Sequence, residues 1–216
     1  MSDPQPRTLG AVLYPQFELL DLYGPLEMFG CLGPALRIVT LADQAGPVAS
    51  TPGVSTLAEY SYANAPPLDL LVVPGGVGTF PQLKNEALLT FLRERAPKCE
   101  VALSVCTGAA LFAAAGLLDG KRATTNKQFF TLTAAAGPKA KWVAEARWVE
   151  DGAIVTASGV SAGTDAALAV IARLWGRKVA EQIAAITEYE WQTDAARDPF
   201  TKYLDKGTLA PDLASA

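Results

Sequence analysis

The chain has 216 residues, half of them hydrophobic, and a net charge of −4 at pH 7. Its length and composition allow a sizeable buried core. The acidic balance and the lack of any basic run argue against nucleic acids and anionic membranes as partners. The chain contains no histidine, which excludes every single-chain mechanism that needs a histidine base or a histidine-bound metal.

Cellular location is predicted from what the sequence lacks. Residues 1–8 have no apolar core of the signal-peptide kind, and no apolar run approaches the ~20 residues of a membrane helix. The three cysteines form neither a CxxC motif nor a disulfide framework. We therefore expect a cytoplasmic protein.

Strand-like and helix-like segments alternate along the chain. Strands are expected at residues 9–14, 36–41, 68–73, 101–105, 122–126, 144–149 and 153–157, with an edge ribbon at 47–50 and 54–57. Helices are expected at about 26–32, and at 82–96, 107–116, 127–136, 161–175 and 178–189. This alternation predicts an α/β fold, an open and mostly parallel sheet between two helical layers. We expect a single domain with its core at about 8–190 and a tail at 191–216, whose last ten residues are loosely ordered.

Cys106 lies at the joint between the strand at 101–105 and the small-residue helix that follows. No loop separates the two elements, so the turn must be abrupt, as in a nucleophile elbow with sulfur in place of oxygen. The helix N-terminus would favour the thiolate. A buried core cysteine at a strand end is the alternative reading.

Two further sites follow predicted strands. Asp21 lies in an apolar stretch just before the first helix. Two interpretations remain open: it caps the helix, or its carboxylate faces a pocket. Gly75 and Gly76 follow the strand at 68–73, where they form a plain turn or bring main-chain amides close to a ligand. Because ligands bind beyond the carboxyl ends of parallel strands, Asp21, Gly75-Gly76 and Cys106 are expected to converge on one crevice.

The segment Gly159–Gly163 matches the GxSxG pattern of serine hydrolases. That mechanism needs a base, usually histidine, to accept the serine proton. Because the chain has none, we interpret Ser161 as the cap of the following helix.

Five segments together carry a family resemblance: residues 17–25 (FELLDLYGP), 69–76 (DLLVVPGG), 104–108 (SVCTG), 116–126 (GLLDGKRATTN) and 157–168 (ASGVSAGTDAAL). The chain resembles the ThiJ/PfpI superfamily, which has a flavodoxin-like, class I glutamine-amidotransferase-like fold. Within it the chain is most similar to isocyanide (isonitrile) hydratases, which have an aspartate matching Asp21 and Cys-Thr-Gly at the elbow. Protease-like and glyoxalase-like branches place a histidine after the cysteine, where this chain has Thr107.

The chain also departs from the hydratase pattern. Asn126 and Lys127 replace a usual His-Trp pair, Tyr23 stands where threonine is common, and the tail at 190–200 differs. The superfamily places position 126 near the cysteine, so Asn126 is expected to touch the substrate. These departures bear on the substrate more than on the nucleophile.

The resemblance implies hydration of R–N≡C to an N-substituted formamide without a metal or organic cofactor. Cys106 would attack the terminal carbon, and Asp21 would serve as general acid and then general base. The amides of Thr107 and Gly76 would stabilise negative charge, and the Thr107 hydroxyl would orient water or Asp21.

Three other functions compete with this one: a redox sensor based on Cys106 oxidation, a glyoxalase-like or deglycase-like enzyme, and a ligand-binding module related to regulators that carry this domain. The resemblance also implies a homodimer, with the first helix at the contact and Asp21 near the interface.

Overall fold

The computed structural model describes residues 6–207, and its centre is a seven-stranded sheet with the order β10-β11-β7-β6-β1-β2-β5. Only β10 is antiparallel to its neighbour, so the mostly parallel sheet expected from the sequence is confirmed. The strands are β1 (Arg7–Val12), β2 (Leu36–Ala42), β5 (Tyr60–Ser61), β6 (Leu70–Val73), β7 (Val101–Val105), β10 (Trp148–Asp151) and β11 (Ile154–Ala157).

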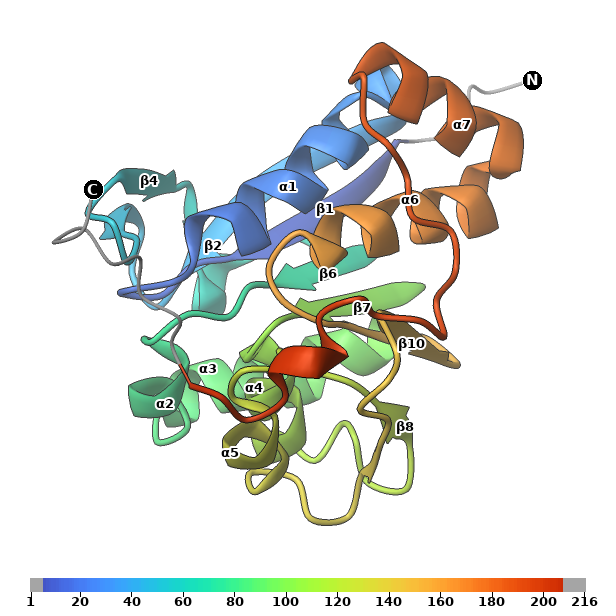
Figure 1. The fold of residues 1–216 in the computed structure, drawn as a ribbon. Helices are drawn as coiled ribbons and strands as arrows, with labels where there is room; N and C mark the ends of the chain where they lie inside the picture. Colours follow the sequence, from blue (N-terminus) through green and yellow to red (C-terminus); the bar gives the residue numbers. More distant parts are fainter. Residues whose placement is uncertain (1–5, 208–216) are drawn as a thin grey trace, which may run out of the picture.

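Helices cover both faces of the sheet (Figure 1). On one face lie α1 (Leu19–Gly30), α6 (Ala162–Trp175) and α7 (Arg177–Ile186). On the other lie α2 (Thr79–Gln82), α3 (Glu86–Arg95), α4 (Gly108–Ala114) and α5 (Phe130–Ala134). The central strands β6 and β7 are buried along their whole length, which is why they read as continuous apolar runs.

Two small sheets stand apart from the main one. The expected edge ribbon is present as the antiparallel pair β3 (Gly46–Ala49) and β4 (Ser55–Ala58). The segment at 122–126 does not join the main sheet, because its strand β8 (Arg122–Ala123) pairs with β9 (Lys141–Trp142).

Helix α1 starts earlier than expected. Pro25 lies inside the helix and not in its first turn, and Asp21 is helical. The helix carries this proline at a close crossing with α6, where a Cβ added to Gly163 would lie 3.2 Å from the Pro25 ring. Gly24 approaches Thr164 still more closely, since a Cβ added to Gly24 would lie 2.5 Å from Thr164 Oγ1. The packing of α1 against α6 thus compensates for the helical hydrogen bond that Pro25, which has no amide proton, cannot form.

Two other predicted helices are shorter than expected. Of the segment at 82–96, only α3 is an α-helix beyond Gln82, the last residue of α2. The side chain of Asn85 caps α3 by accepting from the amides of Ala87 (3.1 Å) and Leu88 (3.2 Å). The segment at 127–136 is helical only in α5. No helix in the described part of the chain has both the length and the apolar character to cross a bilayer.

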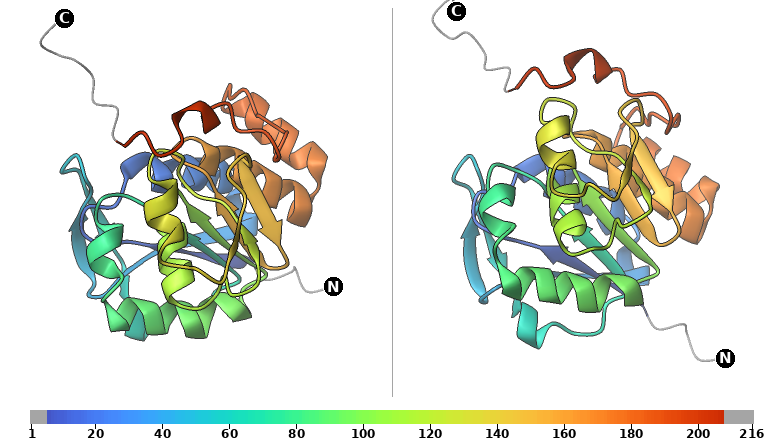
Figure 2. Two further views of the ribbon diagram at one scale, coloured as in Figure 1. Left: turned by 60° about the horizontal axis from the view of Figure 1, so that its bottom comes forward. Right: turned by 90° about the horizontal axis from the view of Figure 1, so that it is seen from below.

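From Trp191 to Gly207 the chain runs back over the rest of the molecule toward α5, with one short 3₁₀ helix, η4 (Thr201–Tyr203) (Figure 2). We call residues 191–207 the strap. Of the ten terminal residues expected to be loosely ordered, 208–216 lie outside the described residues. The division into core and tail remains a prediction.

Candidate active site

Cys106 occupies the abrupt turn from β7 into α4 and has a backbone φ of +56°. This left-handed conformation is costly for a residue with a side chain. Neighbouring strands and loops hold it: the Cys106 amide donates to the carbonyls of Ala157 and Ser158 (both 3.1 Å), and the Thr125 hydroxyl donates to the Cys106 carbonyl (2.7 Å). The side chain is 6% exposed and lines a cavity.

Asp21 is fully buried in the first turn of α1. Its Oδ2 accepts the Gly75 amide at 2.9 Å, and its carboxyl also forms a side-chain hydrogen bond with Cys106. A Cβ on Gly75 would lie 2.9 Å from Asp21 Oδ2 and 2.6 Å from the Thr107 nitrogen. Only glycine therefore lets this turn pass between the carboxyl and the elbow.

Burial raises the pKa of Asp21 and that of Cys106 well above their usual values. Asp21 raises the pKa of Cys106 further by charge repulsion, and the Thr107 amide, hydrogen-bonded to the sulfur, lowers it. The expectation that the helix terminus favours the thiolate is therefore corrected, because desolvation of the sulfur outweighs it. The two groups titrate as a pair that holds at least one proton at neutral pH.

Thr107 belongs to a chain of hydroxyl contacts. Its Oγ1 accepts the Gly76 amide at 3.0 Å, donates to the Gly76 carbonyl at 3.2 Å and lies 2.9 Å from Thr79 Oγ1. The Tyr14 hydroxyl lies 3.0 Å from Thr79 Oγ1 and donates to the Pro74 carbonyl at 2.6 Å. The Gly76 amide and the Thr107 hydroxyl therefore bond to each other, and the Thr107 amide is the donor to the sulfur. The catalytic roles expected of the two residues remain predictions.

The Cys106 cavity has a volume of about 310 Å³. Asn126 lines it, and so does Glu18, which the sequence analysis did not single out. Glu18 precedes Asp21 by one helical turn, and its charge raises the pKa of both Asp21 and Cys106. Asp21 itself is fully buried and is not among the residues that line this cavity. The remaining wall residues are Thr51, Gly76, Val77, Phe80, Thr107, Gln128, Phe129 and Val160.

Ser161 stands at the N-cap position of α6, but its side chain makes no capping bond. Its hydroxyl accepts from Arg147 at 3.3 Å. The GxSxG segment is thus a strand-to-helix turn in which the serine contacts a cation and not a base.

A buried cluster of four charges lies under the strap, and no sequence pattern pointed to it. Asp198 of the strap pairs with Lys127 and with Arg147, both at 3.6 Å. Arg147 also pairs with Asp165 at 2.6 Å. Burial is the largest cause of the lowered pKa of Lys127, about 8.

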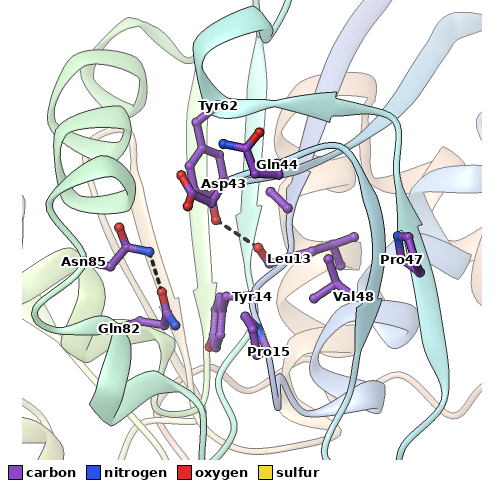
Figure 3. A pocket seen from close by; sticks show the side chains of 11 residues that line it. Leu13, Tyr14, Pro15, Asp43, Gln44, Pro47, Val48, Tyr62, Gln82 and Asn85 are labelled. Carbon is purple, nitrogen blue, oxygen red and sulfur yellow. Dashed lines mark hydrogen bonds between the residues drawn. The ribbon is translucent and has the colours of Figure 1, made fainter.

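A separate hollow of about 310 Å³ has Tyr14 in its wall (Figure 3). Its wall includes Asp43, Gln44, Tyr62 and Asn85 and none of the residues expected to act in catalysis. Tyr14 therefore belongs both to the wall of this hollow and to the chain of hydroxyl contacts that ends at Thr107.

Residues 10–173 match the DJ-1/PfpI family. The chain belongs to the DJ-1/PfpI family. Among curated DJ-1/PfpI relatives it is 35% identical over 181 residues to the isonitrile hydratase of Pseudomonas putida, which covers 84% of this chain and 78% of that enzyme. It is 29% identical over 216 residues to the transcriptional regulator GbdR of Pseudomonas aeruginosa, covering 96% of this chain and 58% of the regulator.

Solved DJ-1/PfpI structures have the same fold. A ThiJ/PfpI family protein from Pseudomonas syringae superposes with a TM-score of 0.80 at 32% identity, over 86% of this chain and 76% of that one. Drosophila melanogaster DJ-1beta superposes with a TM-score of 0.76 at 18% identity, over 86% of this chain and 100% of that one, which supports the fold alone. Since DJ-1/PfpI relatives include an enzyme and a regulator, the reaction must be argued from the site.

Proposed function

We propose that this protein is a cofactor-independent hydratase that converts an isocyanide, R–N≡C, into an N-substituted formamide. The observation that carries the proposal is the hydrogen-bonded pairing of a cavity-lining thiol, Cys106, with a fully buried carboxyl, Asp21. The similarity to an isonitrile hydratase over most of the chain supports the same reaction.

The first step adds the thiol across the terminal carbon. The sulfur of Cys106 forms a bond to that carbon, and the proton shared by the Cys106–Asp21 pair is transferred to it. The product is a thioimidate, R–N=CH–S–Cys106. Raised pKa values suit this step, since the pair retains a proton for delivery at neutral pH.

The second step consumes water. Its oxygen bonds to the thioimidate carbon while one of its protons passes to nitrogen, with Asp21 acting as base and then as acid. The C–S bond then breaks with its electron pair on sulfur, and the hydroxyl proton returns to the Cys106–Asp21 pair. The formamide R–NH–CHO leaves, and the Thr107 amide stabilises the departing sulfur.

The test is formamide production from a small panel of isocyanides, with Cys106→Ala as the inactive control. We expect turnover by the wild-type protein and none by the variant. Undiminished turnover by Cys106→Ala would exclude the covalent scheme.

A redox sensor is the second candidate, supported by the same cavity-lining sulfur with its Thr107 amide contact. Mild peroxide followed by intact-mass measurement separates the two functions. Selective oxidation of Cys106 in a protein that hydrates no isocyanide favours the sensor. A methylglyoxal assay on the same samples tests the glyoxalase-like reading.

We also propose that the active form is a homodimer. Apolar side chains are exposed on α1 at Leu20 (48%) and Tyr23 (43%), and on the β3–β4 ribbon at Val54 (52%) and Leu57 (63%). Tyr23 and Thr56 link the two elements through their hydroxyls at 2.8 Å. A second copy seated on this surface would lie next to the turn of α1 that carries Asp21.

A further inference from the structure

We propose that a second cavity, next to the one at Cys106, binds the N-substituent of the substrate and selects isocyanides whose substituent is neutral and apolar. This inference rests on the proposed hydratase function and assigns its substrate class. The second cavity measures about 260 Å³. We call it the substituent cavity.

The substituent cavity adjoins the reacting sulfur. It shares Asn126, Gln128 and Val160 with the Cys106 cavity. Gly159 belongs to its wall, and a Cβ added to Gly159 would lie 3.1 Å from the Cys106 sulfur. An isocyanide is linear at carbon and nitrogen, so a substrate whose terminal carbon approaches the sulfur end-on projects its substituent away from Cys106. The shared wall makes this neighbouring cavity the place that receives it.

The wall of the substituent cavity is largely apolar, with Leu20, Val160, Phe200 and Tyr203. Phe200 is 45% exposed although its ring is large and apolar, and it stacks on Tyr203 with the ring centroids 6.3 Å apart. A bound apolar group would cover this ring and remove its surface from water.

The Lys127 ammonium and the Ser161 hydroxyl of the wall already have hydrogen-bond partners. The Lys127 ammonium donates to the Ala146 carbonyl at 2.6 Å and to the Thr124 hydroxyl at 2.9 Å. The Ser161 hydroxyl accepts from Arg147. Outside the cavity, Lys202 and Lys206 lie 5.1 and 5.8 Å from the Tyr203 ring. Such a lining disfavours a cationic substituent and gives an anionic one no buried partner.

The two aromatic residues are held between anchors at both ends of their segment. On one side, Asp198 pairs with Lys127 and Arg147 in the buried cluster. On the other, Asp205 accepts from the amide (2.8 Å) and the hydroxyl (2.6 Å) of Thr131. The Asp205 amide also donates to the Lys127 carbonyl at 2.8 Å. Phe200 and Tyr203 thus form a preorganised wall, which suits them to set specificity.

The test compares methyl isocyanide with cyclohexyl isocyanide on the wild-type protein, Phe200→Ala and Leu204→Ala. Leu204 is an exposed apolar residue of the same strap that does not line the cavity, so it is the matched control. We expect Phe200→Ala to lower kcat/KM for cyclohexyl isocyanide about tenfold and to leave methyl isocyanide within about twofold. Leu204→Ala should change neither substrate.

A binding measurement separates this proposal from the proposed function. In the Cys106→Ala background, N-cyclohexylformamide and N-methylformamide are titrated by NMR with and without Phe200→Ala. Weaker binding of the cyclohexyl compound alone on loss of the Phe200 ring supports the substituent cavity, even if no isocyanide is hydrated and the proposed function fails. Binding or kcat/KM that responds equally for both substituents, or a preference for an aminoalkyl over a cyclohexyl group, overturns the assignment.

Discussion

The carboxyl of Asp21 and the amide of Gly75, which lie 54 residues apart in sequence, meet at 2.9 Å in the fully buried centre of the site. This bond fixes one carboxyl oxygen, and the Cys106 side chain is a second hydrogen-bond partner of the carboxyl. Burial, the largest cause of the raised pKa of Asp21, makes the charged carboxylate costly. The arrangement therefore favours the acid form that the first step uses.

Asp21→Asn tests that role. Asparagine can still accept the Gly75 amide, so we expect the fold to persist while hydration slows by about 10²–10⁴-fold. Glu27→Gln, on the exposed side of the same helix, is the matched control and should retain its activity. Kinetics and thermal unfolding of both variants are the measurements, and an Asp21→Asn variant of normal activity would remove Asp21 from the mechanism.

Glu18→Gln tests the electrostatics of the pair. The charge of Glu18 raises the pKa of Asp21 and of Cys106, so removing it lowers both. The one-proton state that the reaction needs is then reached, and lost, at lower pH. We expect the whole pH profile of kcat/KM to move toward acid, and a shift toward alkaline pH would contradict this account.

Thr107→Val should damage both stability and turnover. The change deprives the Gly76 amide and the Thr79 hydroxyl of a partner at a buried position, at a cost of about 1–3 kcal/mol. Thr107→Ser keeps the hydroxyl and should restore most of the loss. Urea unfolding measures the first effect and isocyanide kinetics the second. If the two variants had equal stability and equal turnover, the Thr107 hydroxyl would not be the group responsible for either effect.

The Lys127 ammonium makes stability depend on pH in a predictable direction. Its pKa is about 8 in the folded protein against 10.5 for the free side chain. Between these values the unfolded chain holds more protons than the folded one, so the free energy of unfolding rises with pH. We expect this rise in the wild-type protein from about pH 8 upward and a smaller one in Lys127→Met. Parallel curves for the two proteins would count against a depressed Lys127 pKa.

The homodimer prediction is tested by sedimentation. Leu57→Asp introduces a charge into the exposed surface shared by α1 and the β3–β4 ribbon, and we expect it to shift the protein toward monomer. Ile186→Asp makes the same change at a 72% exposed position on α7 and should leave the association unchanged. Dimerisation that survives Leu57→Asp but not Ile186→Asp would place the interface elsewhere.

The central sheet and the meeting of Gly75 with Cys106 could be predicted from the sequence, because both follow from local hydrophobic patterns. The apolar runs at β6 and β7 predict buried parallel strands, and the carboxyl ends of such strands meet at one edge, which brings Gly75 and Cys106 together. The start of α1 was placed wrongly, because the contact of Pro25 with Gly163 on α6 is a property of tertiary packing.

Neither the pKa values of the site nor the contacts of the strap could be predicted from the sequence. The reasons differ. The pKa of Cys106 depends on how much water the folded protein removes from the sulfur, and no local pattern measures that. The pairing of Asp198 with Lys127 joins residues 71 positions apart, and neither stands in a recognisable motif. Asn126 and Lys127, where the chain departs from the hydratase pattern, prove to lie beside this strap.

The active centre draws on three separate turns: the start of α1 with Asp21, the turn at Gly75 and the elbow at Cys106. Asp21 belongs to helix α1 on one face of the sheet, and Cys106 to the turn from β7 into α4, which covers the other face. A contiguous fragment that holds both must span at least residues 21–106. During refolding, catalytic activity should therefore return only when both layers have docked, later than the helical circular dichroism signal, which makes turnover a direct reporter of completed tertiary structure.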